Sequence, residues 1–151
     1  MAGGPGPDTD VASRQRSLTL VDTSAWVEFL RATGGPVHLR LRELLQRDEP
    51  LATTELVVME VLAGARDGEH LDRLRRAVLG RCQLLAGHGL ADYEEAAAIY
   101  RRCRTQGATV RKLSDCLIAA VAIRARVPLL HADQDFDQIA THCALRTASH
   151  D

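Results

Sequence analysis

The apolar residues fall into two patterns along the chain: short unbroken runs, and longer stretches in which an apolar side chain recurs every three or four positions. Short runs between turn residues are typical of buried strands, and the longer repeat is typical of helices that bury one face. The short runs predict strands over residues 18–21, 51–53, 82–85, 128–131 and 144–147. The repeats predict helices over residues 24–30, 37–45, 54–62, 70–78, 92–106, 115–125 and 136–142.

The order of these elements predicts an α/β fold. Strands that alternate with helices usually pair in parallel, and the helices then cover both faces of the sheet. We therefore expect a single domain over residues 17–151, with a short central parallel sheet of about four or five strands. Residues 1–16 are rich in Gly, Pro and polar side chains and offer little to bury, so we expect a disordered leader there.

Composition excludes several classes of protein. The chain has 151 residues, 46% of them hydrophobic and 26% charged, an ordinary globular mixture rather than that of a fibrous or disordered chain. The longest unbroken apolar run, residues 116–123, is much shorter than the roughly 18 residues of a membrane-spanning helix. Four scattered cysteines, and an N-terminus without an apolar stretch of signal-peptide length, favour the reducing cytoplasm.

The charge balance limits how the chain can meet nucleic acid. Nineteen basic and 20 acidic residues give a net charge of −1, which excludes a positive field over the whole surface but allows a local basic patch. Lys112 is the only lysine. Arginine supplies the other basic side chains, and its planar fork is the better match to phosphate.

Two acidic residues follow predicted strands. Asp22 comes directly after residues 18–21, and Asp133 comes shortly after residues 128–131. In an open parallel sheet the functional crevice lies outside the carboxyl ends of the strands, so both carboxylates are candidates for a functional site. The alternative is that each only caps a helix or closes a turn, because Asp is favoured in both places.

Two further acids lie in apolar helices. Glu60 is surrounded in sequence by Leu, Val and Met, where a charge is costly unless it is paired or coordinated. The alternatives for Glu60 are an exposed helix edge or an ion pair with Arg66. Asp115 opens the most apolar helix, where the helix dipole favours a negative charge. Simple capping is the alternative for Asp115, although Ser114 already offers a cap.

Taken together, Asp22, Glu60, Asp115 and Asp133 predict a site for a hard divalent cation. Like charges that are held close together need compensation, and carboxylate oxygens suit Mg²⁺ or Mn²⁺. Zinc is disfavoured, because the His and Cys residues show neither C-x-x-C nor H-E-x-x-H spacing.

The motifs around these acids resemble those of one family. Residues 20–26 (LVDTSAW) are similar to the opening of PIN-domain proteins, in particular the VapC-type toxins of bacterial toxin–antitoxin pairs. The family's second acid follows a Thr or Ser pair, as Glu60 follows residues 53–54. Residues 113–120 (LSDCLIAA) are similar to its third motif and residues 131–136 (HADQDF) to its fourth. The resemblance spans residues 18–147 and includes all four acidic motifs in order.

This resemblance implies a metal-dependent endoribonuclease with Mg²⁺ or Mn²⁺ as its cofactor. Asp22, Glu60, Asp115 and Asp133 would be the catalytic metal ligands, direct or through water, with Asp135 as a fifth acid. Thr23 and Ser114 would orient these carboxylates through their hydroxyls. Such a site can activate a water and stabilise the charge on the leaving oxygen of a phosphodiester.

The resemblance also implies partners. The substrate would be a specific RNA, commonly transfer or ribosomal RNA, and a small VapB-type antitoxin would cover apolar helix surface around residues 41–45 and 56–62. A homodimer is a further expectation of the family. The candidate phosphate contacts are basic residues ahead of Asp115 and on the preceding helix: Arg111, Lys112, Arg101, Arg102 and Arg104. The alternative for these basic residues is a solvated helix face.

Two features depart from the family pattern. His131 stands where Thr or Ser is usual, and about 16 residues precede the first strand.

Three other functions compete with that of a nuclease. A receiver-type phosphoacceptor domain needs a lysine after a late strand, but Lys112 precedes a helix. A haloacid-dehalogenase-like phosphatase needs a second Asp where Ser24 stands. A non-catalytic PIN-like binding module would be expected to have lost an acid, and none is missing.

Overall fold

A computed structural model describes residues 17–150. The leader predicted over residues 1–16 lies outside these residues. Four strands form one sheet: β1 (Thr19–Val21), β2 (Leu51–Thr53), β3 (Cys82–Leu84) and β4 (Leu129–Leu130). Their order across the sheet is β3-β2-β1-β4, and every neighbouring pair is parallel. The prediction of a short parallel sheet in an α/β fold is confirmed.

The predicted fifth strand is wrong. Residues 144–147 contribute a single bridge, between Thr147 and Leu129, instead of a strand. The chain leaves the sheet after one pair of backbone contacts, in which Leu129 donates to the Arg146 carbonyl and Ala148 donates to the Leu129 carbonyl. At the other edge, β3 is largely exposed rather than buried, and within the described residues it pairs with a strand on one side only, β2.

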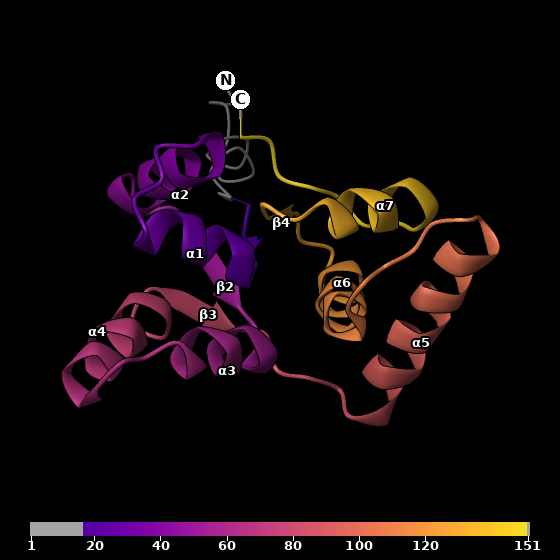
Figure 1. Ribbon diagram of the computed structural model, residues 1–151, viewed down its shortest axis with the longest axis horizontal. Coiled ribbons are helices and arrows are strands. Elements are labelled where there is room, and N and C mark those ends of the chain that lie inside the picture. Colours follow the sequence, from indigo (N-terminus) through magenta and orange to yellow (C-terminus); the bar gives the residue numbers. More distant parts are fainter. Residues whose placement is uncertain (1–16, 151) are drawn as a thin grey trace, which may run out of the picture.

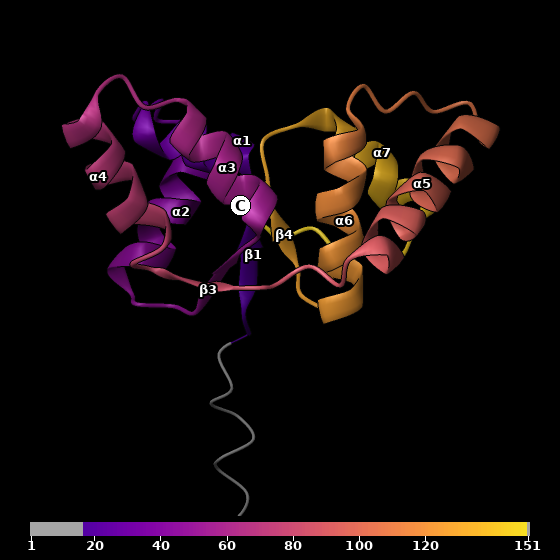
Figure 2. The same ribbon diagram turned by 90° about the horizontal axis from the view of Figure 1, so that it is seen from below.

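Seven helices surround the sheet in the described residues: α1 (Thr23–Leu30), α2 (Pro36–Gln46), α3 (Glu55–Ala63), α4 (Gly68–Val78), α5 (Leu90–Thr105), α6 (Leu113–Ala125) and α7 (Gln134–His142). Figures 1 and 2 show α1 to α4 on one side of β1 and α5 to α7 on the other, with the strands between them. The segment between β3 and α5 crosses from the first group to the second (Figure 2). None of the helices in residues 17–150 is both long and apolar enough to cross a membrane.

The core explains the apolar sequence of α6. Six of the seven residues of α6 from Cys116 to Ala122 are buried between its neighbours, and Leu117 is the less covered one. α5 packs along one side of α6, while α7 and α3 pack on others. Trp26 and Phe136 fill the interior near β1 and β4 and are fully buried. Burial of this apolar surface is the main force that fixes α6 in the fold.

Side chains close the first turns of several helices. Asp22, Thr54 and Asp133 each accept a backbone N–H at the start of α1, α3 and α7. The expected cap at Ser114 is wrong, because α6 begins at Leu113, two residues earlier than predicted. Lys112 takes the cap position instead, and its side chain cannot accept a hydrogen bond.

Strand order determines where a site can form. The chain runs from β1 to β2 and β3 on one side, and it then returns to place β4 on the other side of β1. Such a reversal opens a crevice at the carboxyl ends of the two strands that flank it. Asp22 follows β1 and Asp133 follows β4, so the topology brings these two acids to the same crevice.

Candidate active site

Asp22 is held at the end of β1 by Ser24. The Asp22 Oδ2 atom accepts hydrogen bonds from the Ser24 backbone N–H, at 2.9 Å, and from the Ser24 hydroxyl, at 2.5 Å. Its Oδ1 atom is buried and accepts no hydrogen bond from the described residues. Burial raises the pKa of Asp22 above its usual value, against the two hydrogen bonds from Ser24 that lower it. Asp22 thus caps α1 through its Oδ2 atom, while its Oδ1 atom is available to bind a metal ion.

Ser24 also ties the two sides of the crevice together. Its hydroxyl oxygen accepts the Ala132 backbone N–H at 2.9 Å, while its proton goes to Asp22. One hydroxyl therefore links the end of β1 to the loop after β4. The predicted site residues do not include Ser24, and the signal that could have found it is its position two residues after a strand-end acid.

Glu60 faces Asp22 from α3. The Thr23 hydroxyl donates to Glu60 Oε1 at 3.2 Å. The orienting role of Thr23 stays a prediction. Burial raises the pKa of Glu60, and the negative charge of Asp22 raises it further. The Glu60 side chain is half-buried and accepts no hydrogen bond from Arg66. The structure therefore has neither of the two alternatives for Glu60, the exposed helix edge or the ion pair with Arg66.

Asp115 is the most perturbed acid of the site. Only 5% of the residue is exposed, and its Oδ2 atom is buried without a hydrogen-bond donor among the described residues. Burial, followed by the charges of Asp22 and Asp133, raises the pKa of Asp115 to about 7. Its neighbour Ser114 lies in the first turn of α6 but does not cap it.

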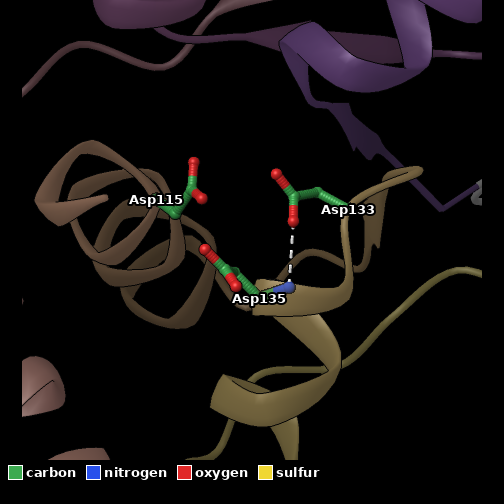
Figure 3. Close-up of side chains that lie close together, drawn as sticks. All are labelled: Asp115, Asp133 and Asp135. Carbon is green, nitrogen blue, oxygen red and sulfur yellow. Dashed lines mark hydrogen bonds between the residues drawn. The ribbon is translucent and has the colours of Figure 1, made fainter. Parts of the chain in front are cut away.

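Asp115, Asp133 and Asp135 form a compact group. Each offers one carboxylate oxygen, and these oxygens lie within 4.8 Å of one another. Figure 3 shows the carboxylates of Asp115 and Asp133 reaching from opposite sides toward a shared space, with Asp135 below them. The Asp135 backbone N–H donates to Asp133 Oδ1 at 3.0 Å, the contact dashed in Figure 3.

Two cations border this group. Arg111 donates through Nη2 to Asp133 Oδ1 at 2.9 Å and through Nε to Asp135 at 3.2 and 3.3 Å. Lys112 Nζ lies 3.8 Å from Asp133 Oδ2, and its charge lowers the pKa values of Glu60 and Asp115. Arg111 and Lys112 are candidate phosphate contacts, with a solvated helix face as the alternative, and the structure shows that both are also engaged with the acids.

His131 supports Asp133 from the strand side. Its Nδ1 atom accepts the Asp133 backbone N–H at 3.2 Å, its ring packs against Phe136, and Nε2 lies 3.5 Å from Asp137. Burial lowers the pKa of His131, so the neutral ring that accepts this bond is favoured. His131 thus supplies an acceptor where the family usually has a hydroxyl.

The donor set fits a hard divalent cation. Asp22, Glu60, Asp115 and Asp133 supply only oxygen atoms, and two of these oxygens are buried without a hydrogen-bond donor. Burial, and after it the repulsion between like charges, raises the pKa values of Glu60 and Asp115, and a bound cation would offset this cost. No cysteine or histidine shares the cluster in the described residues, so zinc remains disfavoured.

The remaining basic candidates lie further out. Arg101, Arg102 and Arg104 are exposed on the last turns of α5, and Arg104 stacks on the Tyr100 ring 5.7 Å from its centroid. Their role in phosphate binding stays a prediction.

A groove of about 470 Å³ lies between α3, α6 and the segment that leads from β3 into the start of α5. Exposed Met59 and Tyr93 line it together with Leu56 and Leu117. The expected apolar surface around residues 56–62 is therefore present. The surface expected around residues 41–45 is not, because Leu41 and Leu44 are buried in the core of this chain.

Comparison with known proteins agrees with this geometry. The PIN domain family matches residues 19–141. A VapC ribonuclease of Mycobacterium bovis and ribonuclease VapC11 of Mycobacterium tuberculosis are each 44% identical to the chain over 133 residues, which cover 87% of this chain and 98% of the relative.

Among solved structures, the VapBC2 complex of Rickettsia felis, bound to a promoter DNA fragment, has a TM-score of 0.65 at 17% identity and covers 87% of this chain and 99% of that chain. VapC20 of Mycobacterium tuberculosis, described as a sarcin–ricin-loop cleaving toxin, has a TM-score of 0.63 at 19% identity and covers 85% and 98%. These two likenesses concern the fold. With the family match and the mycobacterial relatives, they lead to one conclusion: the chain belongs to the PIN-domain family, among the VapC ribonucleases.

Proposed function

We propose that this protein is a metal-dependent, selective endoribonuclease that acts as the toxin of a toxin–antitoxin pair. The observation that carries the proposal is the pair of buried, unpartnered oxygens, Asp22 Oδ1 and Asp115 Oδ2, in a cluster of mutually repelling carboxylates. A structural role would leave such oxygens hydrogen-bonded. Ligation of Mg²⁺ or Mn²⁺ explains both the missing donors and the accumulated charge.

Each acid has a distinct part in this proposal. Asp115 and Asp133 would hold the cation from the two sides of the crevice, Asp22 from the end of β1, and Glu60 through water from α3. Thr23 and Ser24 would fix the angles of Glu60 and Asp22 through their hydroxyls. The bound cation supplies water activation and charge stabilisation for phosphodiester hydrolysis.

The substrate and partners follow from the kinship. Cleavage of a transfer or ribosomal RNA is the activity we expect, and the name of ribonuclease VapC11 supports RNA as the substrate class. We expect a VapB-type antitoxin to cover the groove along α3 and α6, because the solved neighbours include VapBC complexes. A homodimer and a cytoplasmic site of action are further parts of this proposal.

The experiment is cleavage of total bacterial RNA by the purified protein in Mg²⁺ or Mn²⁺. Discrete fragments that disappear with EDTA and in the Asp22→Asn protein are the expected result. Asp72→Asn is a matched control, because Asp72 is exposed on α4, a helix that carries none of the site residues. Cleavage that survives both EDTA and Asp22→Asn would rule the proposal out, and a folded protein without any cleavage would favour a non-catalytic PIN-like binding module.

A further inference from the structure

Arg111 is docked at the acid site by its own backbone as well as by its side chain. Asp135 Oδ2 accepts the Arg111 backbone N–H at 3.0 Å, and both oxygens of Asp135 accept from Arg111 Nε. Asp135 itself is buried. Three contacts from one residue therefore occupy the Asp135 carboxylate, whereas Asp115 offers an oxygen that no donor in the described residues reaches.

The Arg111 guanidinium still has donors to spare. Nε and Nη2 are used on Asp135 and Asp133, while Nη1 has no hydrogen-bond partner within residues 17–150. The side chain is 66% exposed. Arg124 provides the contrast, because its side chain is only 29% exposed. Its Nε and Nη2 atoms both donate to Asp92, and Nη2 also donates to the Ala86 carbonyl. These contacts have a structural role, since they join α6 to α5.

The surroundings of Arg111 favour an anion beside the carboxylates. Lys112 follows it, with an exposed ammonium 3.8 Å from Asp133. The first turn of α6 starts there without a side-chain cap, so its N–H groups add to the positive potential. A guanidinium with a fixed orientation and remaining donors suits a phosphate oxygen, which it can bind through a bidentate contact.

We propose that Arg111 binds the RNA phosphate next to the acid cluster, and that Asp135 is the positioning residue for Arg111 rather than a metal ligand. This inference rests on the proposed function and divides the five acids into two groups. Asp22, Glu60, Asp115 and Asp133 serve the cation, and Asp135 serves the arginine.

The test measures RNA binding apart from cleavage. A short fluorescent RNA is titrated with protein at several salt concentrations in Ca²⁺ instead of Mg²⁺, and a gel confirms that the RNA stays intact. Arg111→Gln should weaken binding by about tenfold and lower the slope of log affinity against log salt by about 0.7. Arg111→Lys should restore the slope but not the cleavage rate. Arg73→Gln on α4 is the matched control.

The second arm measures Mn²⁺ affinity by magnetic resonance, without RNA. Asp133→Asn should weaken Mn²⁺ binding at least tenfold, whereas Arg111→Gln and Asp135→Asn should change it less than threefold. Asp135→Asn should instead reproduce the RNA-binding loss of Arg111→Gln, and the double variant should add little to it.

Two results would overturn the inference. One is a salt slope for Arg111→Gln equal to that of the wild type. The other is an Asp135→Asn protein that loses Mn²⁺ as Asp133→Asn does while it retains RNA binding. If the wild type does not cut RNA but Arg111→Gln still lowers the slope, phosphate binding stands and the nuclease proposal fails.

Discussion

Asp92 and Asp115 occupy equivalent positions in neighbouring helices, but the hydrogen-bond partners of their carboxylates differ. Each is the third residue of its helix, α5 or α6. Each donates its backbone N–H to the residue three positions back at 3.2 Å, and they are 4% and 5% exposed. Arg124 holds both oxygens of Asp92 at 3.0 and 2.9 Å, and His88 donates to it as well. Asp115 has no such cation, and its Oδ2 is unpartnered in the described residues.

The comparison separates structural from functional burial. Both aspartates give up hydration, which is costly for an ionised carboxylate. The Asp92 charge is compensated by this chain's own arginine, so it serves to hold α5 and the segment after β3 against α6. The Asp115 charge is not compensated, and its pKa rises to about 7 as a result. Burial alone therefore does not identify a functional acid, whereas burial without a partner does.

The strongest test of this contrast is the loss of catalysis. Asp115→Asn keeps the side-chain shape but removes the charge, so we expect the rate of RNA cleavage to fall by about 10³-fold while the protein remains folded. Asp92→Asn is the paired control and should cleave RNA at a rate close to that of the wild type, measured per folded molecule. Comparable losses in the two proteins would show that the contrast is not functional.

The next largest effect concerns stability. Asp92→Ala leaves the Arg124 charge and the His88 N–H without their partner, so the free energy of unfolding should fall by about 3 kcal/mol. The double variant Asp92→Leu with Arg124→Met should recover most of this loss, because it replaces the charge pair by apolar contact. Urea denaturation followed by circular dichroism measures both. An Asp92→Ala protein as stable as the wild type would contradict the structural role of Asp92.

Ser24 offers a smaller effect on the functional half. Ser24→Ala removes the hydroxyl that donates to Asp22 and accepts from Ala132, so Asp22 loses its fixed orientation. Affinity for Mn²⁺ should fall about 10- to 100-fold. Thr105→Ala is a suitable control, because the Thr105 hydroxyl bonds only to a carbonyl of its own helix. If both variants bind Mn²⁺ as the wild type does, Ser24 has no positioning role.

Local sequence patterns were enough to predict most of the fold. Apolar patterns identified the four strands and seven helices of residues 17–150, because most of these elements bury apolar side chains; β3 is the exception, since it is largely exposed. Periodicity failed at residues 144–147, where a short apolar stretch makes one bridge only. It also failed at Ser114: this residue is suited to capping, but it lies inside α6, because the helix begins two positions earlier than predicted.

The acids could be predicted, but their partners could not. Asp22 and Asp133 stand out because they follow strands, and Glu60 and Asp115 because they interrupt apolar helices. The pairs Arg111–Asp135 and Arg124–Asp92 join residues 24 and 32 positions apart, and no local pattern encodes such contacts. The assignment of Asp135 as a metal ligand therefore stays a prediction. The contacts of Arg111 with the Asp135 carboxylate favour a different role for it.

The pH dependence of stability gives the smallest and most specific test. The folded protein raises the pKa of Asp115 from 3.8 to about 7, so between these values the folded state binds more protons than the unfolded state. Stability from this group is therefore present at low pH and is lost as pH rises through 7. Without metal, the wild type should lose about 2 kcal/mol more than Asp115→Asn between pH 5 and pH 8, since water at the mouth of the crevice screens part of the shift. Mg²⁺ at pH 8 should stabilise the wild type more than the variant, because it binds the ionised carboxylate. Urea midpoints measured across this pH range would test both expectations. Parallel stability profiles for the two proteins would show that the raised pKa of Asp115 is not the source of the pH dependence.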